Sequence, residues 1–489
     1  MEPQAAHRAT AIVFVGAALL VALSILTRAV NHDEGQYVAA IAMMRGGWPY
    51  LDFPYLQTPL QPLLLSTLSM LPAGWLLVAA RCANGLFALA TLATLFGALR
   101  DRVQPRSALI AIAALACTEP FLLASSLARN DALPMVLIAG GIAAMVGAIG
   151  AQRSGRALAL AGLLLGLATS AKISAAAPAA AAGLFVLLRA RRFGLLGLGA
   201  FALGALAGLA PIAIAAIATL QHFWFGAFAY SLEAPQQWWT IVGRAADLEP
   251  LHRIGRLIEL ALLGPMPFAL VAAALDRRRS EERLLLDLMI VCGLVGAYLP
   301  EPPFTQYLVP LLPPLFARFG LAVDGGREHW RRPLLLLSVV AGLVYTGVYT
   351  VAGLPKGGID LVQAVRQGRA VARLAAGGTI VTLSPEAFVG ADTHLDRGFV
   401  TGPFLFRTYG DLSATALRLG FAPNWQRLDT ALAARPPAVI VTGRETKRWP
   451  PLFPNGLDAP LADWAVAHGY TPVRLAGGST AFVRRSAAR

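Results

Sequence analysis

Charged residues are scarce in this sequence. Asp, Glu, Lys and Arg make up 14% of the 489 residues, and hydrophobic residues make up 56%, whereas ordinary soluble domains carry about 25% charged residues. The deficit lies in long apolar runs, and the mean hydropathy is +0.60. This pattern excludes an ordinary soluble globular protein and predicts a polytopic α-helical membrane protein.

Cysteines are also few. Cys82, Cys117 and Cys292 each lie inside an apolar segment without a pairing pattern, so we interpret them as small buried residues rather than as a disulfide framework or metal ligands. The sequence contains no convincing repeat or low-complexity tract, and no glycine-rich phosphate loop stands between a strand and a helix. We therefore predict no nucleotide site.

Acidic residues are outnumbered, with 27 Asp and Glu against 41 Lys and Arg, which gives a net charge of +14. Such a balance can indicate a nucleic-acid partner. Here, however, the basic residues form short clusters between apolar runs, as cytoplasmic loops of membrane proteins do. We predict no nucleic-acid partner and place five clusters on the inner side: 100–106, 152–156, 189–192, 276–283 and 327–332.

This placement fixes a topology, because a spanning helix needs roughly 20 apolar residues. It predicts about eleven spans, with the amino terminus inside and the tail outside; no convincing cleavage site follows the first apolar run, so we expect it to be retained. The short apolar segment 59–72 is predicted as a half-inserted helix on the outer side. The predicted spans are 11–27, 75–99, 107–124, 132–150, 157–171, 173–189, 193–219, 255–275, 284–300, 303–323 and 333–353.

The composition changes near residue 356. The stretches "GTIVTLSP", "PAVIVTG", "YTPVRL" and "TAFVRR" predict strands, and "DLVQAVRQGRAVARLAA" and "PLADWAVAHG" predict helices. We therefore predict a transmembrane domain over 1–355 with outer loops at 28–74 and 221–256, followed by a small soluble α/β domain over 356–489 on the outer side.

In this topology, three polar turns share the outer face: 28–58, 125–134 and 169–178. The first contains Asn31, Asp33 and Glu34 just before an apolar run. One interpretation is helix capping, since Asn and acidic side chains satisfy or favour the free amides of a first helical turn. The alternative adds chemistry to that structural role.

The chemical interpretation is transfer of a sugar to an alcohol. Such a transfer needs a carboxylate to take the proton of the acceptor hydroxyl, and cations or donors where charge develops on a phosphate leaving group. The second turn offers Asp131 beside Arg129, and the third offers Lys172. Each also has a structural alternative: a salt bridge or helix cap for Asp131, and snorkelling to headgroups for Lys172. Together on one face they predict an acid–base and phosphate site.

The same residues carry a resemblance. "HDEGQYVAAIAMMRGGWPYLDFPYLQTPL" resembles the first outer loop of the GT-C superfamily of membrane glycosyltransferases, in the branch of protein O-mannosyltransferases and lipid A aminoarabinose transferases. "ARNDALP", "GLATSAKISAAAP" and "EPPFTQYLVPLLPPL" are similar to later motifs of that branch. The resemblance covers about residues 10 to 320.

The resemblance implies an inverting transfer from a polyprenyl-phosphate sugar at the periplasmic face of a bacterial cytoplasmic (inner) membrane, onto a glycolipid such as lipid A, another surface glycan or a protein. It implies Asp33 as the general base, Glu34 and Asp131 shaping the acceptor pocket, and Lys172 with Arg129 at the donor phosphate. Residues expected to line the site, of which the aromatic ones can equally be interfacial anchors, are Tyr37, Tyr55, Gln57, Gln306 and Tyr307.

The chain also departs from the branch pattern. Gln57 and Thr58 stand where an acidic–basic pair is usual, and Gln36 stands where an Arg is often found. These changes remove cationic groups and put transfer of aminoarabinose in doubt; Arg244 or Arg256 could assist at the donor phosphate.

Metal dependence and a second class of function stay open at this point. We expect no obligatory metal, although Asp33 and Asp131 could share a divalent ion if they converge. The alternative function is a transporter or flippase of a lipid-linked saccharide, which should show paired repeats and polar residues at mid-bilayer. A scaffold without chemistry leaves the clustering on one face unexplained.

Overall fold

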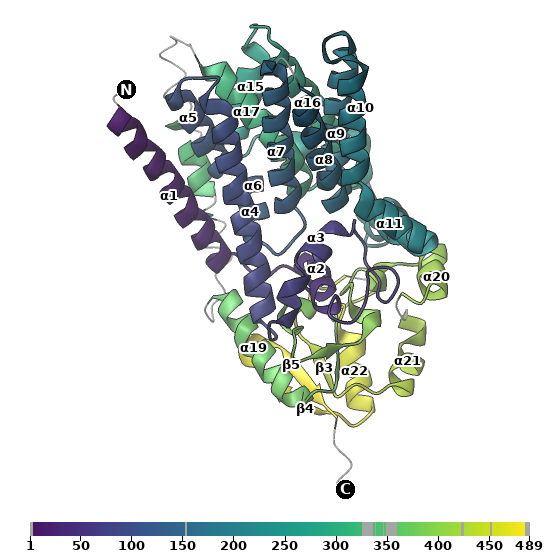
Figure 1. Cartoon of the computed structure of the whole chain (residues 1–489). Helices are drawn as coiled ribbons and strands as arrows, with labels where there is room; N and C mark the ends of the chain where they lie inside the picture. Colours follow the sequence, from purple (N-terminus) through teal and green to yellow (C-terminus); the bar gives the residue numbers. More distant parts are fainter. Residues whose placement is uncertain are drawn as a thin grey trace.

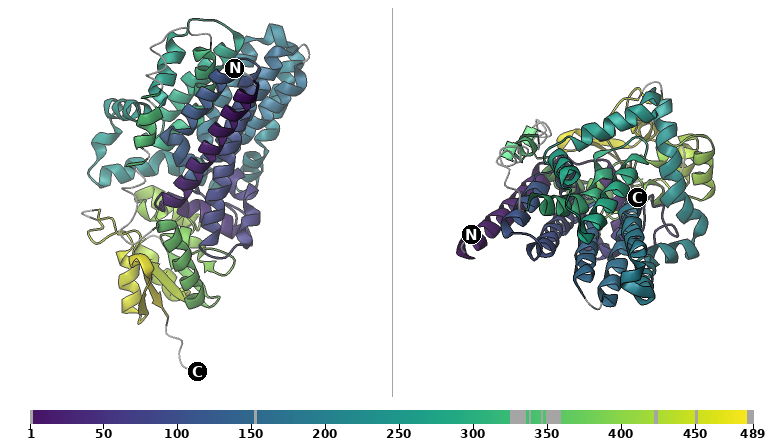
Figure 2. Two further views of the ribbon diagram at one scale, coloured as in Figure 1. Left: turned by 90° about the vertical axis from the view of Figure 1, so that its left-hand side faces the viewer. Right: turned by 90° about the horizontal axis from the view of Figure 1, so that it is seen from above.

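Apolar helices form one end of the molecule, and a small mixed sheet with its own helices forms the other (Figure 1). This computed structural model describes residues 3–151, 154–324, 336–337, 339–345, 347–348, 359–421, 425–449 and 452–484. The first helix begins at the end of the bundle that lies away from the sheet, as the left view of Figure 2 also shows.

Five helical segments in the described part of the chain are long and apolar enough to cross a membrane. They carry large apolar side chains that are exposed: Leu196 of α10 (Ala190–Gly208), for example, is 91% exposed. Exposed apolar surface of this extent fits a lipid environment. The five segments are residues Ala6–Thr27 within α1 (Pro3–Thr27), α4 (Trp75–Arg100), α7 (Ala132–Gly150), α10 (Ala190–Gly208), and η5 (Thr305–Leu311) with α17 (Leu312–Val323).

Three predicted spans are broken rather than continuous. Helices α5 (Pro105–Ala116) and α6 (Glu119–Ser126) meet at 65°, and α14 (Pro250–Ala261) and α15 (Met266–Leu275) meet at 97°. The third, 193–219, is divided into α10 and α11 (Ala210–Ala218), and α11 leans away from the bundle (Figure 1). Each break coincides with a proline in the first turn of the second helix: Pro120, Pro267 or Pro211. Proline has no backbone N–H and cannot continue the hydrogen-bond ladder of the preceding helix.

The remaining predicted segments form short helices, form further helices of the bundle, or lie largely outside the described residues. The segment 59–72 forms α3 (Leu60–Leu64) and the 3-10 helix η1 (Ser66–Met70), each too short to cross a bilayer. Apolar helices α8 (Gly155–Ala171) and α9 (Ala176–Leu188) and the longer α16 (Glu281–Tyr298) complete the bundle. The predicted eleventh span, 333–353, lies largely outside the described residues, so the number of about eleven spans stays a prediction.

Helices α8 and α10 pack through small residues. A Cβ added to Gly162 would lie 2.1 Å from the carbonyl oxygen of Phe201, and one added to Gly208 would lie 2.3 Å from that of Leu163. The two backbones therefore approach more closely than any larger side chain allows, which is the usual device for packing helices in lipid.

The predicted inner loops meet at the end of the bundle opposite the sheet. Arg102 donates to Glu282 over 2.8 Å, and Arg189 lies 3.3 Å from Glu281. Arg278 donates to the Asp324 carbonyl over 2.6 Å. The clusters 100–106, 189–192 and 276–283 thus share one face, as the topology predicts; part of 152–156 and all of 327–332 lie outside the described residues.

The carboxy-terminal region contains a five-stranded sheet of order β2-β1-β3-β5-β4. Strand β1 is parallel to β2 and β3, whereas β5 is antiparallel to β3 and β4. Helices α20 (Gly410–Arg418) and α21 (Leu428–Ala434) lie between β2 and β3 in the sequence. The four predicted strands are confirmed as β1 (Thr379–Thr382), β3 (Val439–Thr442), β4 (Thr471–Arg474) and β5 (Thr480–Val483). The two predicted helices are confirmed as α19 (Asp360–Ala375) and α22 (Ala459–Ala467). Strand β2 (His394–Leu395) was not predicted.

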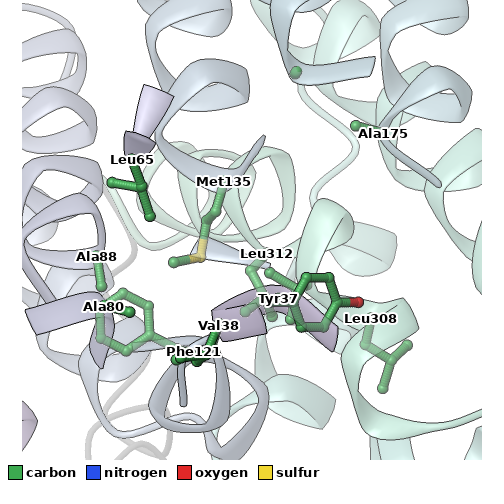
Figure 3. Packing of buried hydrophobic residues seen from close by; sticks show 14 of the residues in the cluster. Tyr37, Val38, Leu65, Ala80, Ala88, Phe121, Met135, Ala175, Leu308 and Leu312 are labelled. Atoms are coloured by element: carbon green, nitrogen blue, oxygen red, sulfur yellow. The ribbon is translucent and has the colours of Figure 1, made fainter. Parts of the chain in front are cut away.

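The first outer loop joins the two ends of the molecule. Asp360 of α19 accepts from the Val30 amide over 2.7 Å, and Asp392 accepts from the Ala73 amide over 2.7 Å. Beneath this contact, α2 (Asp33–Met43) packs on the bundle through Tyr37 and Val38, which gather with Phe121, Met135 and Leu312 in Figure 3. The position of α2 is therefore set by the membrane helices on one side and by the carboxy-terminal region on the other.

Candidate active site

A cavity of about 840 Å³ lies between the helical bundle and the carboxy-terminal region. Its walls come from the start of α2, from α13 (Tyr230–Ile241), from η5, and from loops that follow the strands β1 and β3. The volume is within the range of small-molecule and cofactor sites. Segments distant in the sequence therefore enclose one space that can hold a saccharide.

Asp33 stands at the rim of this cavity, at the first position of α2. Its amide donates to the Asn31 side chain over 2.8 Å, which orients the turn. The Asp33 side chain is 23% exposed, lines the cavity and lies 3.1 Å from the His32 ring nitrogen Nε2. Of the two predicted aspartates, Asp33 is therefore the one that a substrate can reach.

A chain of ion pairs connects Asp33 with the other two predicted turns. Arg129 pairs with Asp33 through Nη1 and donates from Nε to Asp131 over 3.0 Å. Lys172 pairs with the other oxygen of Asp131, which is fully buried. The structure thus brings together all three turns that the topology placed on one face; Arg129 lines the cavity, whereas Asp131 and Lys172 lie behind it.

Glu34 has a different environment from its neighbour. It is completely buried and accepts from Arg81 over 2.8 and 2.6 Å, from the Ala128 amide over 2.7 Å and from the Asn31 amide over 2.9 Å. Arg81 also donates to the Ile25 and Arg28 carbonyls at the end of α1. Glu34 therefore ties α1, α4 and the turn before α7 to the start of α2, and the capping interpretation holds for Asn31 and Glu34.

The residues predicted to line the site divide into two groups. Tyr37, Gln57, Gln306 and Tyr307 line the cavity, and the ammonium group of Lys172 lies 5.7 Å from the centre of the Tyr307 ring. Tyr55 is fully buried, and its hydroxyl has no hydrogen-bond partner within the described ranges.

Two cations considered as further phosphate ligands lie elsewhere. Arg244 and Arg256 pair with Asp247 and Glu259, one helical turn away in the same stretch of chain, at 2.5 and 2.7 Å. Among the described residues that line the cavity, neither is present. The cations nearest the predicted base are instead Arg129 and groups from the carboxy-terminal region.

Sequence reasoning missed that second set of groups. Glu386, Arg407, Arg444 and Glu445 all line the cavity. Arg407 donates to Glu445 over 3.1 Å, and Arg444 lies 3.4 Å from Asp360 and 3.8 Å from Glu386. Glu386, Arg444 and Glu445 come directly after predicted strands, and Arg407 lies in the stretch between those strands. Nothing in their local pattern distinguishes them from surface charges.

The charges around the cavity alter the pKa values of its acids. Burial by itself would raise the pKa of Asp33, but the opposing effects of Arg129 and His32 hold it well below its usual range. Burial raises the pKa of Glu386 to about 8, with Arg444 acting in the opposite direction. Asp33 is thus an anion in the resting site, and Glu386 carries a proton at neutral pH.

For a divalent ion, the geometry between the two aspartates is unfavourable. The Arg129 guanidinium lies between the Asp33 and Asp131 carboxylates and pairs with both, so a shared cation would have to displace it. Within the described ranges, no three His, Cys, Asp or Glu side chains are grouped to hold a metal ion.

Comparison with solved structures identifies the fold. ArnT from Cupriavidus metallidurans bound to undecaprenyl phosphate gives a TM-score of 0.59 at 17% sequence identity, covering 97% of this chain and 98% of that chain. The Archaeoglobus fulgidus oligosaccharyltransferase in complex with Zn and sulfate gives 0.51 at 13% identity, covering 96% and 73%. A search of curated proteins gives no match.

These structures share the fold of this chain, and together with a matching family model they identify the GT-C superfamily of multi-pass membrane glycosyltransferases. The model of glycosyltransferase family 87 matches residues 55–302, slightly more than half of the chain. The chain belongs to glycosyltransferase family 87. The resemblance inferred from the first outer loop is thereby confirmed at the level of the superfamily.

The buried Glu34–Arg81 pair makes a stability prediction. Glu34→Gln should destabilise the protein by about 3–5 kcal/mol, because it leaves the Arg81 charge buried without its partner. The double variant Glu34→Gln/Arg81→Met removes both charges and should recover a large part of that loss. Thermal unfolding of all three proteins in detergent measures this; an effect of Glu34→Gln below about 1 kcal/mol, as is usual for exposed pairs, would contradict the structural role.

The raised pKa of Glu386 makes a pH prediction. Between the unfolded value of 4.5 and the folded value of about 8, the folded protein keeps a proton that the unfolded chain releases. Stability should therefore fall as the pH rises through this range. In Glu386→Gln the part of the pH dependence of stability that comes from this carboxyl should disappear. Unfolding midpoints measured from pH 5 to 8 test this, and equal slopes for both proteins would show that Glu386 is ionised in the fold.

Proposed function

We propose that this chain is an inverting glycosyltransferase that moves a sugar from a polyprenyl-phosphate donor to an acceptor of the bacterial cell envelope. The acceptor is a glycolipid, a surface glycan or a protein. The observation that carries the proposal is the position of Asp33, whose carboxylate faces the cavity while Arg129 links it to Asp131. Membership of glycosyltransferase family 87 supports the reaction class.

The donor class is supported by the lipid in a related fold. The ArnT structure is described as bound to undecaprenyl phosphate, and the fold is shared over nearly the whole of both chains. A lipid-borne phosphate suits a site whose cations stand beside membrane helices. Arg129 and Lys172 are the cations of the bundle that lie next to Asp33 and Asp131.

In the proposed reaction, Asp33 takes the proton of the acceptor hydroxyl. The acceptor oxygen bonds to the anomeric carbon from the face opposite the phosphate, and the bond from that carbon to the phosphate oxygen breaks. The configuration inverts, and polyprenyl phosphate leaves with the bonding electrons. Arg129 and Lys172 stabilise the charge that develops on the leaving phosphate.

The resting ion pair also suggests how the base is activated. While Arg129 pairs with Asp33, the pKa of that carboxyl is too low for efficient proton transfer at neutral pH. A donor phosphate that binds Arg129 competes with Asp33 for the guanidinium. Donor binding would then raise the basicity of Asp33 at the moment when the sugar is in place. No metal is needed for this sequence.

We further propose that the site faces the periplasm from the cytoplasmic membrane. The basic loops gather at the end of the bundle that lies away from the sheet (Figure 1), and cytoplasmic loops collect Lys and Arg. The cavity and the region from residue 356 then lie on the outer side, with that region forming a soluble α/β domain.

The catalytic proposal predicts a selective loss of transfer. Asp33→Asn should lower the rate at least about 100-fold, because the amide cannot accept the proton, while the folded protein persists. Purified protein receives a radiolabelled polyprenyl-phosphate sugar and an envelope extract, and labelled product is counted. Asp411→Asn, which alters an exposed carboxylate of α20, serves as the matched control and should transfer normally.

Two outcomes would change the proposal. Normal transfer by Asp33→Asn would remove Asp33 as the base. If the wild-type protein moves intact lipid-linked sugar between the leaflets of a vesicle but forms no glycosidic bond, the chain is a transporter.

The orientation makes a separate prediction. A reporter that is active only in the periplasm should be active when fused after Arg489 and inactive when fused after Gln104. A reporter that is active only in the cytoplasm should give the opposite result. Equal signals from the two positions would overturn the topology.

A further inference from the structure

Cationic and aromatic side chains alternate along one wall of the cavity. The Arg407 guanidinium lies 5.3 Å from the centre of the Trp238 ring, Trp238 and Trp449 meet edge to face at 5.1 Å, and the Lys447 ammonium lies 4.1 Å from the Trp449 ring. All four residues line the cavity. Three come from the carboxy-terminal region, and Trp238 comes from α13. We call this set the cation–aromatic wall.

The wall holds hydrogen-bond donors that lack acceptors. The Arg407 Nε and Trp449 Nε1 atoms are buried, and neither has a hydrogen-bond partner in the part of the chain that the structure describes. Leaving a buried donor unpaired costs about 1–3 kcal/mol. Two such donors in one cavity wall indicate that a ligand rich in oxygen atoms supplies the acceptors.

The positive charge of the wall is also incompletely matched. Arg407 has one carboxylate partner, Glu445, and Lys447 has none among the described residues. By contrast, the guanidinium of Arg129 is shared by two carboxylates. An anionic ligand is therefore favoured at Arg407 and Lys447 over a neutral one of the same shape.

The position of the wall relative to Asp33 indicates which substrate binds there. His32, the neighbour of Asp33, contacts Phe404 of the loop that also carries Arg407, and Arg407 is among the charges that lower the pKa of Asp33. Asp33 thus lies between Arg129 on the bundle side and Arg407 on the carboxy-terminal side. A lipid-borne donor phosphate approaches from the membrane helices, which leaves the Arg407 side for the acceptor.

We propose that the cation–aromatic wall is the acceptor subsite, and that it selects a saccharide with a carboxylate or phosphate group close to the accepting hydroxyl. Arg407 binds the anionic group, and the Trp449 indole N–H donates to a neighbouring saccharide oxygen. Lys447 adds charge at the cavity mouth. The assignment to the acceptor rests on the proposed glycosyltransferase function; the preference for anionic saccharides does not.

A purely structural role is the competing explanation. Arg407 and Trp449 also join α13 to the carboxy-terminal region, so their loss could loosen the fold without touching a ligand. Two conservative variants separate the roles. Arg407→Lys keeps the charge and the aromatic contact, and Trp449→Phe keeps a ring but removes the N–H donor.

The test is equilibrium dialysis of the full-length protein in nanodiscs against radiolabelled glucose 6-phosphate, glucuronate and glucose. The wild-type protein should bind the two anionic sugars at least about 10-fold more tightly than glucose, as expected for a charge-assisted hydrogen bond. Arg407→Gln should abolish this preference, and Arg407→Lys should retain part of it. Trp449→Phe should weaken the binding of all three sugars by about 2- to 10-fold, because a neutral hydrogen bond is lost.

Control variants and a second ligand test whether the loss of anionic preference is specific to Arg407. Arg418→Gln removes an exposed arginine of the same region and should bind like the wild-type protein. Binding of undecaprenyl phosphate should be unchanged in Arg407→Gln and weakened in Arg129→Gln. Unfolding midpoints identify any variant that has lost its fold, in which case Arg407→Lys and Trp449→Phe decide the question.

Three results would overturn the proposal. These are equal binding of the three sugars by the wild-type protein, an anionic preference that persists in Arg407→Gln, and a loss of undecaprenyl phosphate binding in Arg407→Gln, which would place the lipid phosphate there. Failure of the proposed function is distinguishable from these. It would be seen as selective anionic-sugar binding, sensitive to Arg407→Gln, in a protein that transfers no sugar from any polyprenyl-phosphate donor.

Discussion

The chain of ion pairs from Asp33 through Arg129 and Asp131 to Lys172 joins three turns that are far apart in the sequence. Charges buried in this way are costly unless each one is paired. The pairing therefore requires the three turns to adopt one arrangement, and the wall of the cavity follows from it. The same chain holds Asp33 as an anion, so the chemistry proposed for the site and the packing of the outer loops depend on one interaction.

The two adjacent acids at the start of α2, Asp33 and Glu34, have different roles. Asp33 and Glu34 are adjacent in sequence, yet helical geometry turns Asp33 to the cavity and Glu34 to Arg81 in the protein interior. Glu34 holds the start of α2 against the bundle, and this support keeps Asp33 at the cavity rim. The structural and chemical interpretations of the motif are thus both needed, for different residues.

Much of the architecture was predictable because it follows from local pattern. Apolar runs and basic clusters placed the turns of Asp33, Asp131 and Lys172 on one face, and alternating apolar residues located β1, β3, β4 and β5. The breaks between α5 and α6 and between α14 and α15 were missed, although Pro120 and Pro267 in the first turn of each second helix were a sequence signal for them. Arg81 had a signal that was overlooked: an arginine inside a predicted span usually has a buried partner.

The sequence alone indicated a multi-pass membrane protein with three polar turns on one face, and the resemblance of its first loop to a known family indicated the GT-C superfamily. The first conclusion rests on composition and apolar runs, and the second rests on the resemblance of short contiguous motifs. Only the tertiary structure placed Arg407, Trp238 and Trp449 in one wall of the cavity that Asp33 also lines. Their partners lie tens to hundreds of residues away along the chain, and contacts over such separations depend on how whole elements pack rather than on any local pattern.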